Sequence, residues 1–292
     1  QTRSREDMSV MELPSAYIRY RMRGEGGPTL VMVPDPPAVL EHYDRLFDLM
    51  APNQRTVVFE TPACGFSVPK PGFDFQFEPW VLTLLSFLER LDAGPYVLAF
   101  PCVSSFAAIA IALRAPHLVE GLILPQAAGW GELRRWVLSR SRFGLLTVPI
   151  YGQMLLYALK RRRASGMFKL LAQKHVEELV EMADVSFAQG ALFPFATATQ
   201  KYLTRRPPDF MTPLRIPTRV VWGAADPSHR EIETDPGSAR RLLPDAEVTV
   251  FEEAGHFPEL EEPELFAAVV SDFCRSLRPG VPSPDEPLSG VV

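Results

Sequence analysis

Short apolar runs alternate with amphipathic stretches over most of the chain. The runs are rich in Val, Leu, Tyr and Phe, which is typical of buried β-strands, and the stretches between them repeat apolar residues at helical spacing. The strand candidates are residues 17–22, 29–33, 56–60, 96–100, 121–124, 218–222 and 247–251. The helix candidates are residues 40–50, 80–91, 106–114, 237–243 and 264–277. This alternation predicts an α/β protein with a mostly parallel, doubly wound sheet.

The alternation stops between residues 127 and 213. There Trp, Phe, Tyr, Met and Leu recur at helical spacings without β-type runs. We therefore predict a helical cap at 127–213, inserted into a core domain formed by 1–126 and 214–278. The last segment, 279–292, is rich in Pro, Gly and Ser, which predicts a disordered tail.

Composition narrows the class of partner. The chain has 292 residues, of which 47% are hydrophobic and 22% charged, enough apolar sequence for one large core. The net charge of −5 opposes the phosphate backbone of nucleic acids, so we expect no nucleic-acid partner. The basic run KRRR at 160–163 is interpreted as a solvated helix face.

No apolar stretch approaches the roughly 18 residues of a membrane span and no targeting segment is present, so we expect a cytoplasmic protein without membrane association.

The chain contains three cysteines, Cys64, Cys102 and Cys274. They lie far apart, without the short spacings of a zinc site or a disulfide framework. We therefore expect reduced thiols and neither a metal nor an organic cofactor. Cys102 stands out because it follows a strand candidate, in VLAFPCVSSFAA at 97–108, where the chain changes to a helix of small residues. The residues themselves allow a nucleophile or a small buried thiol at this position.

Three stretches resemble the α/β-hydrolase fold superfamily. They are VLAFPCVSS with the following FAAIAIALRAPHLVEGLIL, then VVWGAADP, then EEAGHFPELEEPELFAAVVSDF. They are similar to the superfamily's nucleophile elbow, its acid-bearing strand end and its histidine loop. The resemblance implies the α/β-hydrolase fold over about residues 17–277, with a helical cap above the pocket. It also implies a triad of Cys102, Asp226 and His256, in which His256 is general base and then acid and Asp226 orients its ring.

Ser104 and Ser105 compete with Cys102 for the nucleophile position. In the superfamily the elbow helix runs about four turns, and Arg114 and Pro116 mark its end here, which places the nucleophile at Cys102. The turn must also follow the strand directly, before the helix-forming FAAIAIA.

Structural interpretations stay open for several of these residues. His256 could be a hydrogen-bonded structural histidine, and Asp226 a turn residue before proline. His229 could be a polar partner in the pocket, although a surface position is favoured. Glu60, in ETPACGFS, replaces the superfamily's common Asp and is interpreted as structural.

The expected oxyanion hole departs most from the family pattern. In VPDPPAVLEHY, Pro34 and Asp35 replace the usual His-Gly, and Pro36 falls where a donor amide is required. Proline has no N–H, so the amide of Val103, after the nucleophile, remains as the expected donor. Phe100 also stands where the superfamily prefers glycine.

These observations lead to three hypotheses for function. The first is a Cys-His-Asp enzyme that hydrolyses or transfers the acyl group of a hydrophobic ester, thioester or lactone. The second is a lyase or cyclase that acts on a polyketide-like natural product with His256 as base. The third is a non-catalytic binding protein of the same fold. In each case the partner is a hydrophobic small molecule, and Pro36, Phe100, Trp130 and Phe257 are the expected pocket residues.

Overall fold

The computed structural model describes residues 7–62, 64–132, 135, 148–158, 160–188, 191–204, 212–231 and 234–278. In these residues, nine strands form one sheet in the order β1-β2-β4-β3-β6-β7-β8-β9, with β5 paired to β2. The strands are β1 (Met8–Glu12), β2 (Ala16–Arg23), β3 (Thr29–Met32), β4 (Thr56–Phe59), β5 (Val68–Pro69), β6 (Tyr96–Ala99), β7 (Val119–Pro125), β8 (Thr218–Gly223) and β9 (Glu247–Phe251). Neighbours from β4 to β9 are parallel, and β1, β2 and β5 add an antiparallel edge. The predicted mostly parallel α/β sheet is confirmed.

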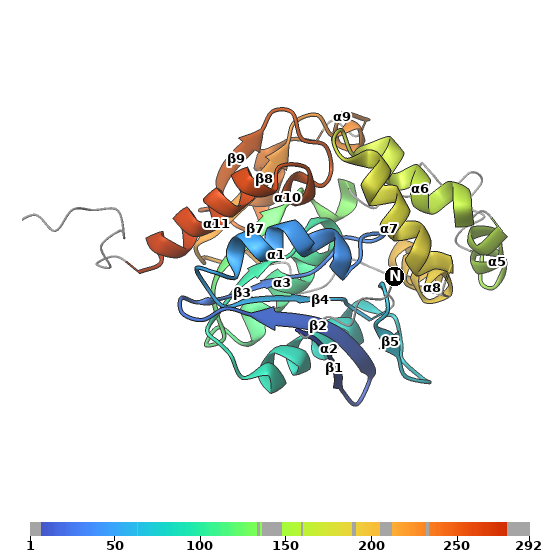
Figure 1. Cartoon of the computed structure of the whole chain (residues 1–292), viewed down its shortest axis with the longest axis horizontal. Coiled ribbons are helices and arrows are strands. Elements are labelled where there is room, and N and C mark those ends of the chain that lie inside the picture. The colour runs from blue at the N-terminus through green and yellow to red at the C-terminus, as the bar shows by residue number, and fades with distance from the viewer. Residues whose placement is uncertain are drawn as a thin grey trace, which may run out of the picture.

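Helices cover both faces of this sheet (Figure 1). Those of the core are α1 (Asp44–Met50), α2 (Phe77–Leu91), α3 (Ser105–Arg114), α9 (Pro227–Glu231), α10 (Pro258–Glu261) and α11 (Pro263–Ser276), with the 3-10 helices η1 (Leu40–Tyr43), η2 (Cys102–Ser104) and η4 (Pro236–Arg241). α1 packs against α11, and α2 packs against α3.

Alternation along the strands explains the two layers of core. In β3, Leu30 and Met32 belong to the cluster with α1 and α11, whereas Val31 belongs to the cluster with α2 and α3. Every residue of β3 is buried, because both faces of a parallel sheet are covered. A continuous apolar run was therefore the correct pattern for these central strands.

The helical insertion is present. Its helices are α5 (Tyr151–Ala158), α6 (Lys160–Leu171), α7 (Val176–Ala188) and α8 (Leu192–Thr204), and they lie together beside the sheet (Figure 1). α6 packs against α7, and α5 packs against α8. The basic run at 160–163 begins α6, but its side chains lie outside the described residues, as does the expected tail 279–292.

The insertion contacts the core close to the predicted histidine loop. The backbone N–H of His256 donates to the carbonyl of Leu171, at the end of α6, over 3.0 Å. The ring of Phe168 lies 4.8 Å from that of Phe257 and 5.2 Å from that of His42, measured between centroids. These contacts fix one end of the insertion above the carboxyl edge of the sheet.

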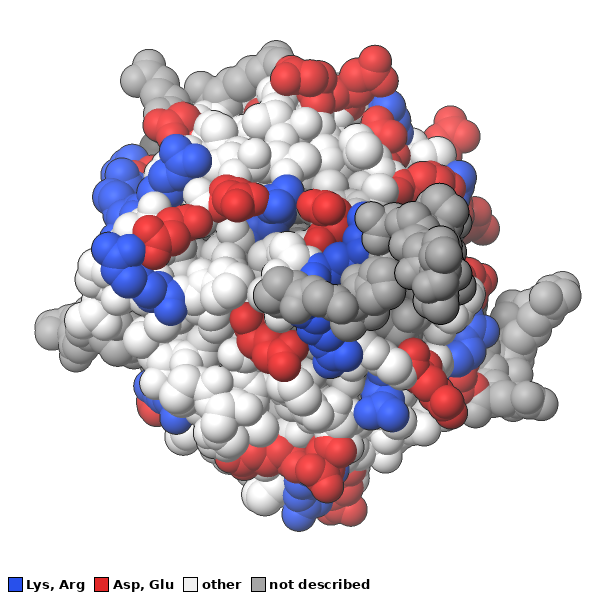
Figure 2. Space-filling model, turned by 90° about the vertical axis from the view of Figure 1, so that its left-hand side faces the viewer, with Lys and Arg blue, Asp and Glu red and all other residues white. Residues whose placement is uncertain are grey.

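The surface carries both signs of charge. Figure 2 shows acidic and basic side chains interspersed over one face of the molecule. None of the helices in the described part of the chain is both long enough and apolar enough to span a bilayer.

Candidate active site

The carboxyl ends of the parallel strands bring the candidate residues together. Asp35 follows β3 and Cys102 follows β6. Gln126, Asp226 and His256 follow β7, β8 and β9 respectively. Because these strands are parallel and adjacent, their carboxyl ends share one edge of the sheet, where open α/β sheets bind ligands.

Cys102 occupies a strained turn between β6 and α3. Its φ is +46°, in the left-handed region that side chains other than glycine rarely adopt. The backbone N–H of Val103 hydrogen-bonds to the Cys102 sulfur, and the hydroxyl of Ser105 donates to the Cys102 carbonyl over 2.6 Å. Ser105 is therefore engaged in the helix start. A non-glycine residue in this conformation costs about 1–3 kcal/mol, and such strain is typical of functional turns.

His256 lies beside Asp226, as the sequence predicted. The Nδ1 atom of His256 is 2.6 Å from Oδ2 of Asp226. The Asp226 carboxylate also accepts from the Ser228 backbone N–H at 2.8 Å and from the Gln126 amide at 2.8 Å. Burial opposes its ionised form, but His256 outweighs that effect and lowers the pKa of Asp226 to about 2. The carboxylate is therefore ionised at neutral pH and holds the imidazole by Nδ1.

Gln126 was missed by the sequence analysis. Besides Asp226, its side chain binds the end of β8, where the Gly223 N–H donates to Oε1 over 2.9 Å. A side chain at Gly223 would not fit, because a Cβ there would lie 1.9 Å from the Gly255 carbonyl oxygen. This close approach of the acid loop to the histidine loop holds Asp226 and His256 at hydrogen-bond distance.

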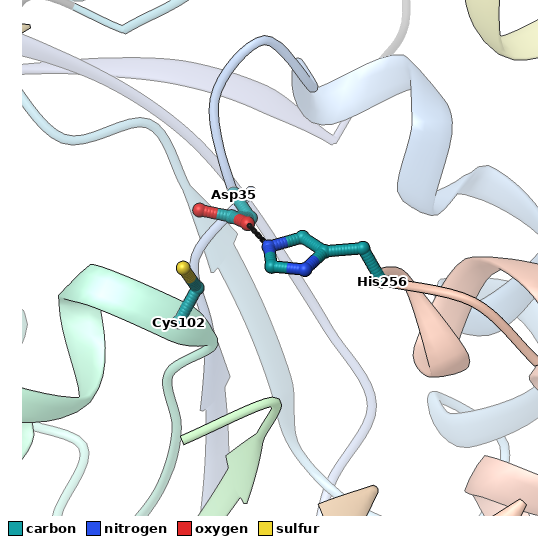
Figure 3. Close-up of side chains that lie close together, drawn as sticks. All are labelled: Asp35, Cys102 and His256. Atoms are coloured by element: carbon teal, nitrogen blue, oxygen red, sulfur yellow. Dashed lines mark ion pairs between the residues drawn. The ribbon is translucent and has the colours of Figure 1, made fainter. Parts of the chain in front are cut away.

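The unexpected member of the site is Asp35. Its carboxylate Oδ2 is 3.3 Å from Nε2 of His256, and Figure 3 shows it beside the Cys102 sulfur. One ligand-type atom each from Asp35, Cys102 and His256 lies within 4.8 Å of the others. Asp35 is only 4% exposed, so water screens its charge weakly. Asp35 directly precedes Pro36, the position at which the family resemblance implied a donor amide and which has no N–H. The loss of this oxyanion donor stays a prediction.

This arrangement favours the charged form of His256. Burial opposes the charge, but the Asp226 carboxylate and the other groups around the ring outweigh it and raise the pKa of His256 well above 6.5. Nδ1 faces Asp226 and Nε2 faces Asp35, so each ring N–H of the imidazolium has a carboxylate acceptor. His256 therefore rests as a proton donor whose Nε2–H points into the site.

Cys102, in contrast to His256, is held in its neutral, protonated form. Burial, reinforced by the negative charge of Asp35, raises the pKa of its thiol to about 11. The imidazolium of His256 works against this increase but does not cancel it. In a Cys-His ion pair the thiolate is the partner of the imidazolium. Here Asp35 takes that place, and Cys102 remains a neutral thiol.

We expect alkylation of Cys102 by iodoacetamide to report this state directly. In the wild type the rate rises tenfold per pH unit up to about pH 11, because only the thiolate reacts. Asp35→Asn removes the nearby negative charge and is expected to speed alkylation at pH 8 by about tenfold, one pKa unit. Peptide mass mapping separates Cys102 from Cys64 and Cys274. An unchanged rate in Asp35→Asn would show that Asp35 does not control the thiol.

The surface position favoured for His229 is wrong. The residue is 3% exposed, and its ring lies 4.1 Å from that of Trp222, measured between centroids. Its Nε2 is 3.2 Å from Asp226 Oδ2. Burial lowers the pKa of His229 to about 4, so its ring is neutral at pH 7 and contributes no charge to Asp226.

A further buried carboxyl lies behind the site. Glu259 accepts a hydrogen bond of 2.8 Å from the Tyr43 hydroxyl, which also lies 3.3 Å from the Val33 carbonyl oxygen. Burial raises the pKa of Glu259 to about 7, with a further increase from Asp35. Tyr43 thereby connects α10 to the chain segment that leads into Asp35.

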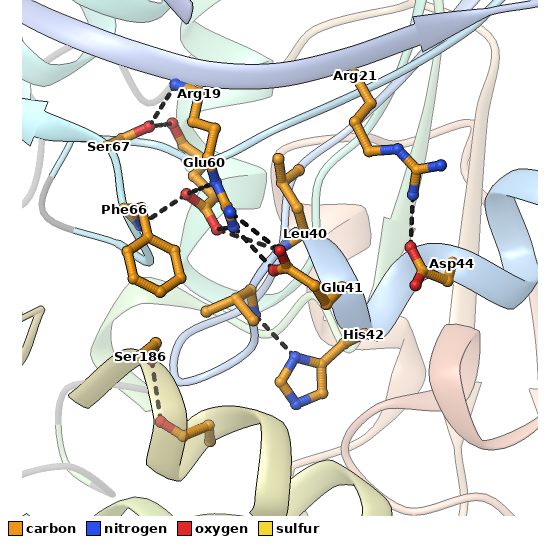
Figure 4. Close-up of polar contacts among 12 residues, drawn as sticks. Arg19, Arg21, Leu40, Glu41, His42, Asp44, Glu60, Phe66, Ser67 and Ser186 are labelled. Atoms are coloured by element: carbon orange, nitrogen blue, oxygen red, sulfur yellow. Dashed lines mark hydrogen bonds and ion pairs between the residues drawn. The ribbon is translucent and has the colours of Figure 1, made fainter. Parts of the chain in front are cut away.

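Glu60 has the structural role that the sequence suggested. Its fully buried carboxylate binds Arg19 and accepts from the backbone N–H groups of Leu40 and Phe66 at 3.1 and 2.7 Å (Figure 4). Leu40 ends the loop that carries Asp35. Glu60 therefore anchors that loop to β2.

The expected pocket residues differ in position. Phe257 lies 5.2 Å from the His256 ring, measured between centroids, and Pro36 directly follows Asp35. Phe100 and Trp130 are buried in the core, where they pack edge-on against Phe59 and Phe106. Their role as pocket lining remains a prediction.

Comparison with known proteins agrees with the observed fold. The family model described as "Alpha/beta hydrolase family" matches residues 30–269. A 2-hydroxy-6-oxononadienedioate/2-hydroxy-6-oxononatrienedioate hydrolase 2 of Pseudomonas putida is 25% identical over 267 residues, which cover 88% of this chain and 91% of that protein. The dihydrolipoyllysine-residue acetyltransferase component of the acetoin cleaving system of Pseudomonas putida is 26% identical over 257 residues. That match covers 84% of this chain but only 63% of the acetyltransferase component.

Similarity to solved structures extends over the whole fold. The crystal structure of an epoxide hydrolase from Bacillus megaterium, in complex with an inhibitor, superposes with a TM-score of 0.73 at 18% identity. The superposition covers 91% of this chain and 100% of that one. Together with the sheet order and the helical insertion, these matches show that the chain belongs to the alpha/beta hydrolase family.

Proposed function

We propose that this protein catalyses acid–base chemistry on a hydrophobic carbonyl compound, as a lyase or cyclase, with His256 as proton donor and Asp35 as base. The observation that carries the proposal is the carboxylate of Asp35, 3.3 Å from Nε2 of His256. It provides a base next to an acid at the carboxyl edge of the sheet. Cys102 contributes to the shape of the site as a neutral thiol.

An acyl-enzyme at Cys102 is disfavoured by charge. Attack of a thiolate on a carbonyl creates an oxyanion, and loss of one oxyanion donor costs about 2.7–4 kcal/mol of transition-state stabilisation. Here the donor at Pro36 is missing and a carboxylate lies next to it. Two like charges about 4 Å apart repel by about 4 kcal/mol at an effective dielectric constant near 20. Both effects oppose the oxyanion.

The same charges favour proton transfer. Asp35 takes a proton from the carbon next to the substrate carbonyl, while Nε2–H of His256 donates its proton to the carbonyl oxygen. The product of this step is a neutral enol, so no oxyanion has to form beside Asp35. The electron pair of the enol then expels a leaving group on the neighbouring carbon or closes a ring onto a second carbonyl, and the proton on oxygen returns to His256. Asp35 gives the proton that it took from carbon to the leaving group or to the new alkoxide, so both residues return to their starting states.

The comparisons support a carbonyl substrate. The hydrolase relative is named for 2-hydroxy-6-oxononadienedioate and 2-hydroxy-6-oxononatrienedioate, unsaturated chains that carry an oxo group at carbon 6. Such compounds exchange protons at carbon.

Acyl transfer through Cys102 is the second candidate, and one observation favours it. The φ of +46° places Cys102 in a strained turn before α3, with the Val103 N–H on its sulfur. This is the arrangement by which α/β-hydrolases expose a nucleophile. For this chemistry Asp35 must move away from the sulfur when substrate binds.

Mass spectrometry and deuterium exchange separate the two candidates. Wild type and Cys102→Ala are incubated with activated medium-chain esters and thioesters, and their intact masses are followed. In parallel, both are incubated in D₂O with hydrophobic 1,3-dicarbonyl compounds. We expect no acyl adduct, and deuterium incorporation that is faster than in the same solution without protein and equally fast with wild type and Cys102→Ala. Incorporation no faster than the enzyme-free rate would contradict the acid–base proposal. An adduct that forms and decays only when Cys102 is present would overturn the acid–base proposal in favour of acyl transfer.

A further inference from the structure

Three different ligand types converge at one point in the site. The thiol of Cys102, the Nε2 atom of His256 and the carboxylate of Asp35 all lie within 4.8 Å of one another, and all three residues are buried. They come from separate loops, after β6, β9 and β3, and their side chains point toward a common centre (Figure 3). This convergence is independent of the reaction proposed above.

The donor set matches a divalent metal of intermediate softness. Zn²⁺ binds thiolate sulfur at about 2.3 Å, imidazole nitrogen at about 2.0–2.1 Å and carboxylate oxygen at about 2.0–2.2 Å. In a tetrahedral site these bonds separate neighbouring ligand atoms by roughly 3.4–3.6 Å. The His256 Nε2 and Asp35 Oδ2 atoms are already 3.3 Å apart. The Cys102 sulfur lies within 4.8 Å of the ligand atoms of both residues.

The groups that hydrogen-bond to His256 also suit a metal ligand. A histidine that binds a metal through Nε2 usually donates its Nδ1–H to a carboxylate, which fixes the ring and makes it a stronger ligand. Nδ1 of His256 is 2.6 Å from Asp226, and the Gln126 amide holds the same carboxylate oxygen at 2.8 Å. Nε2 is therefore left facing Cys102 and Asp35.

A second cluster is a poorer candidate. Asp226, His229 and His256 also have ligand-type atoms within 4.8 Å of one another. In that cluster Asp226 Oδ2 already accepts from both His256 and Gln126, so a metal would have to break these hydrogen bonds. It would also lack a sulfur ligand.

We propose that Asp35, Cys102 and His256 form a binding site for Zn²⁺, with a fourth position open to water. On binding, the thiol proton and the Nε2 proton pass to solvent, and the metal takes the freed electron pairs. Thiolate ligation selects Zn²⁺ over Mg²⁺ and Ca²⁺, which prefer oxygen ligands. Nε2 has one electron pair, so a bound metal prevents His256 from donating a proton. Zinc therefore switches off the acid–base reaction.

Cobalt substitution tests the site without any substrate. The full chain is titrated with Co²⁺, and absorption is recorded in the near ultraviolet and visible. We expect a thiolate-to-cobalt charge-transfer band and the visible bands of a tetrahedral centre, saturating at one equivalent. Cys102→Ser is expected to remove the charge-transfer band, whereas Cys274→Ser, which changes a buried cysteine outside the cluster, keeps it. Asp226→Asn is expected to weaken binding by about 10- to 100-fold.

A second measurement uses only the wild type, so it does not depend on the folding of a variant. Zn²⁺ is expected to slow alkylation of Cys102 by more than tenfold, and a chelator is expected to restore the rate. Absence of the charge-transfer band, its persistence in Cys102→Ser, or equal alkylation with and without Zn²⁺ would each overturn the zinc site. Because neither readout involves turnover, this result is separate from the fate of the proposed reaction.

Discussion

Replacing His256 with glutamine is expected to reduce the rate of proton exchange on a substrate by about 100- to 10,000-fold, the usual contribution of a positioned acid or base. Glutamine keeps a hydrogen-bonding group near Asp226 but cannot donate a proton to a carbonyl and take it back. Deuterium incorporation into the 1,3-dicarbonyl compounds measures the effect. His117→Gln makes the same change at an exposed histidine and is expected to leave the rate unchanged.

The pH dependence distinguishes an acid from a base. The pKa of His256 is raised above 6.5 in the folded protein, so the imidazolium persists at neutral pH. If His256 acts as the proton donor, the rate is constant near pH 7 and falls as the pH rises through this higher pKa. A rate that instead increases as the pH rises through about 6.5 would show that the neutral ring is required, contrary to the mechanism proposed here.

Replacing Arg19 with methionine is expected to lower the free energy of unfolding by about 3–5 kcal/mol, the typical cost of removing one partner from a buried ion pair. Arg19 binds the Glu60 carboxylate through two nitrogens, at 3.0 and 2.5 Å, and Glu60 is fully buried. Without Arg19, Glu60 keeps only backbone N–H donors, and burial raises its pKa. Denaturant unfolding, followed by circular dichroism, measures the loss.

Arg23→Met provides the matched control on the same strand. Arg23 pairs with Asp48 at the surface, where both side chains are about half exposed or more. Exposed pairs contribute about 0–1 kcal/mol, so a small change is expected. Equal losses in the two variants would show that the burial of Glu60 does not set the energy of its ion pair. Because Glu60 also holds Leu40, Arg19→Met is expected to loosen the loop that carries Asp35.

The parallel sheet could be predicted from the sequence because each of its central strands contains a short run of consecutive apolar residues. Strands covered on both faces, such as β3 and β8, are short apolar runs that need no knowledge of their neighbours. Of the antiparallel edge, β2 was predicted, at residues 17–22, but β1 and β5 were missed for the opposite reason. No residue of β1 is fully buried and Val10 is 63% exposed, and β5 has only two residues.

For the candidate site, sequence order was sufficient for Cys102, Asp226 and His256, because each belongs to a local motif with a characteristic turn or loop. Asp35 and Gln126 have no such motif. In the sequence Asp35 was only a departure from a family pattern, and Gln126 was one polar residue after a strand. One signal was available for both: a polar residue directly beyond a buried parallel strand lies at the ligand-binding edge of the sheet.

The sequence by itself determined the α/β class and the helical insertion and named Cys102, Asp226 and His256 as candidates, since these depend on local periodicity and short motifs, but it did not identify Asp35. The tertiary structure alone decided the charge state of the site. Burial and Asp35 raise the pKa of the Cys102 thiol, whereas Asp226 is the main group that raises the pKa of His256, with a further contribution from Asp35 at 3.3 Å. Electrostatic interactions depend on distance and burial, and neither is written in the order of residues.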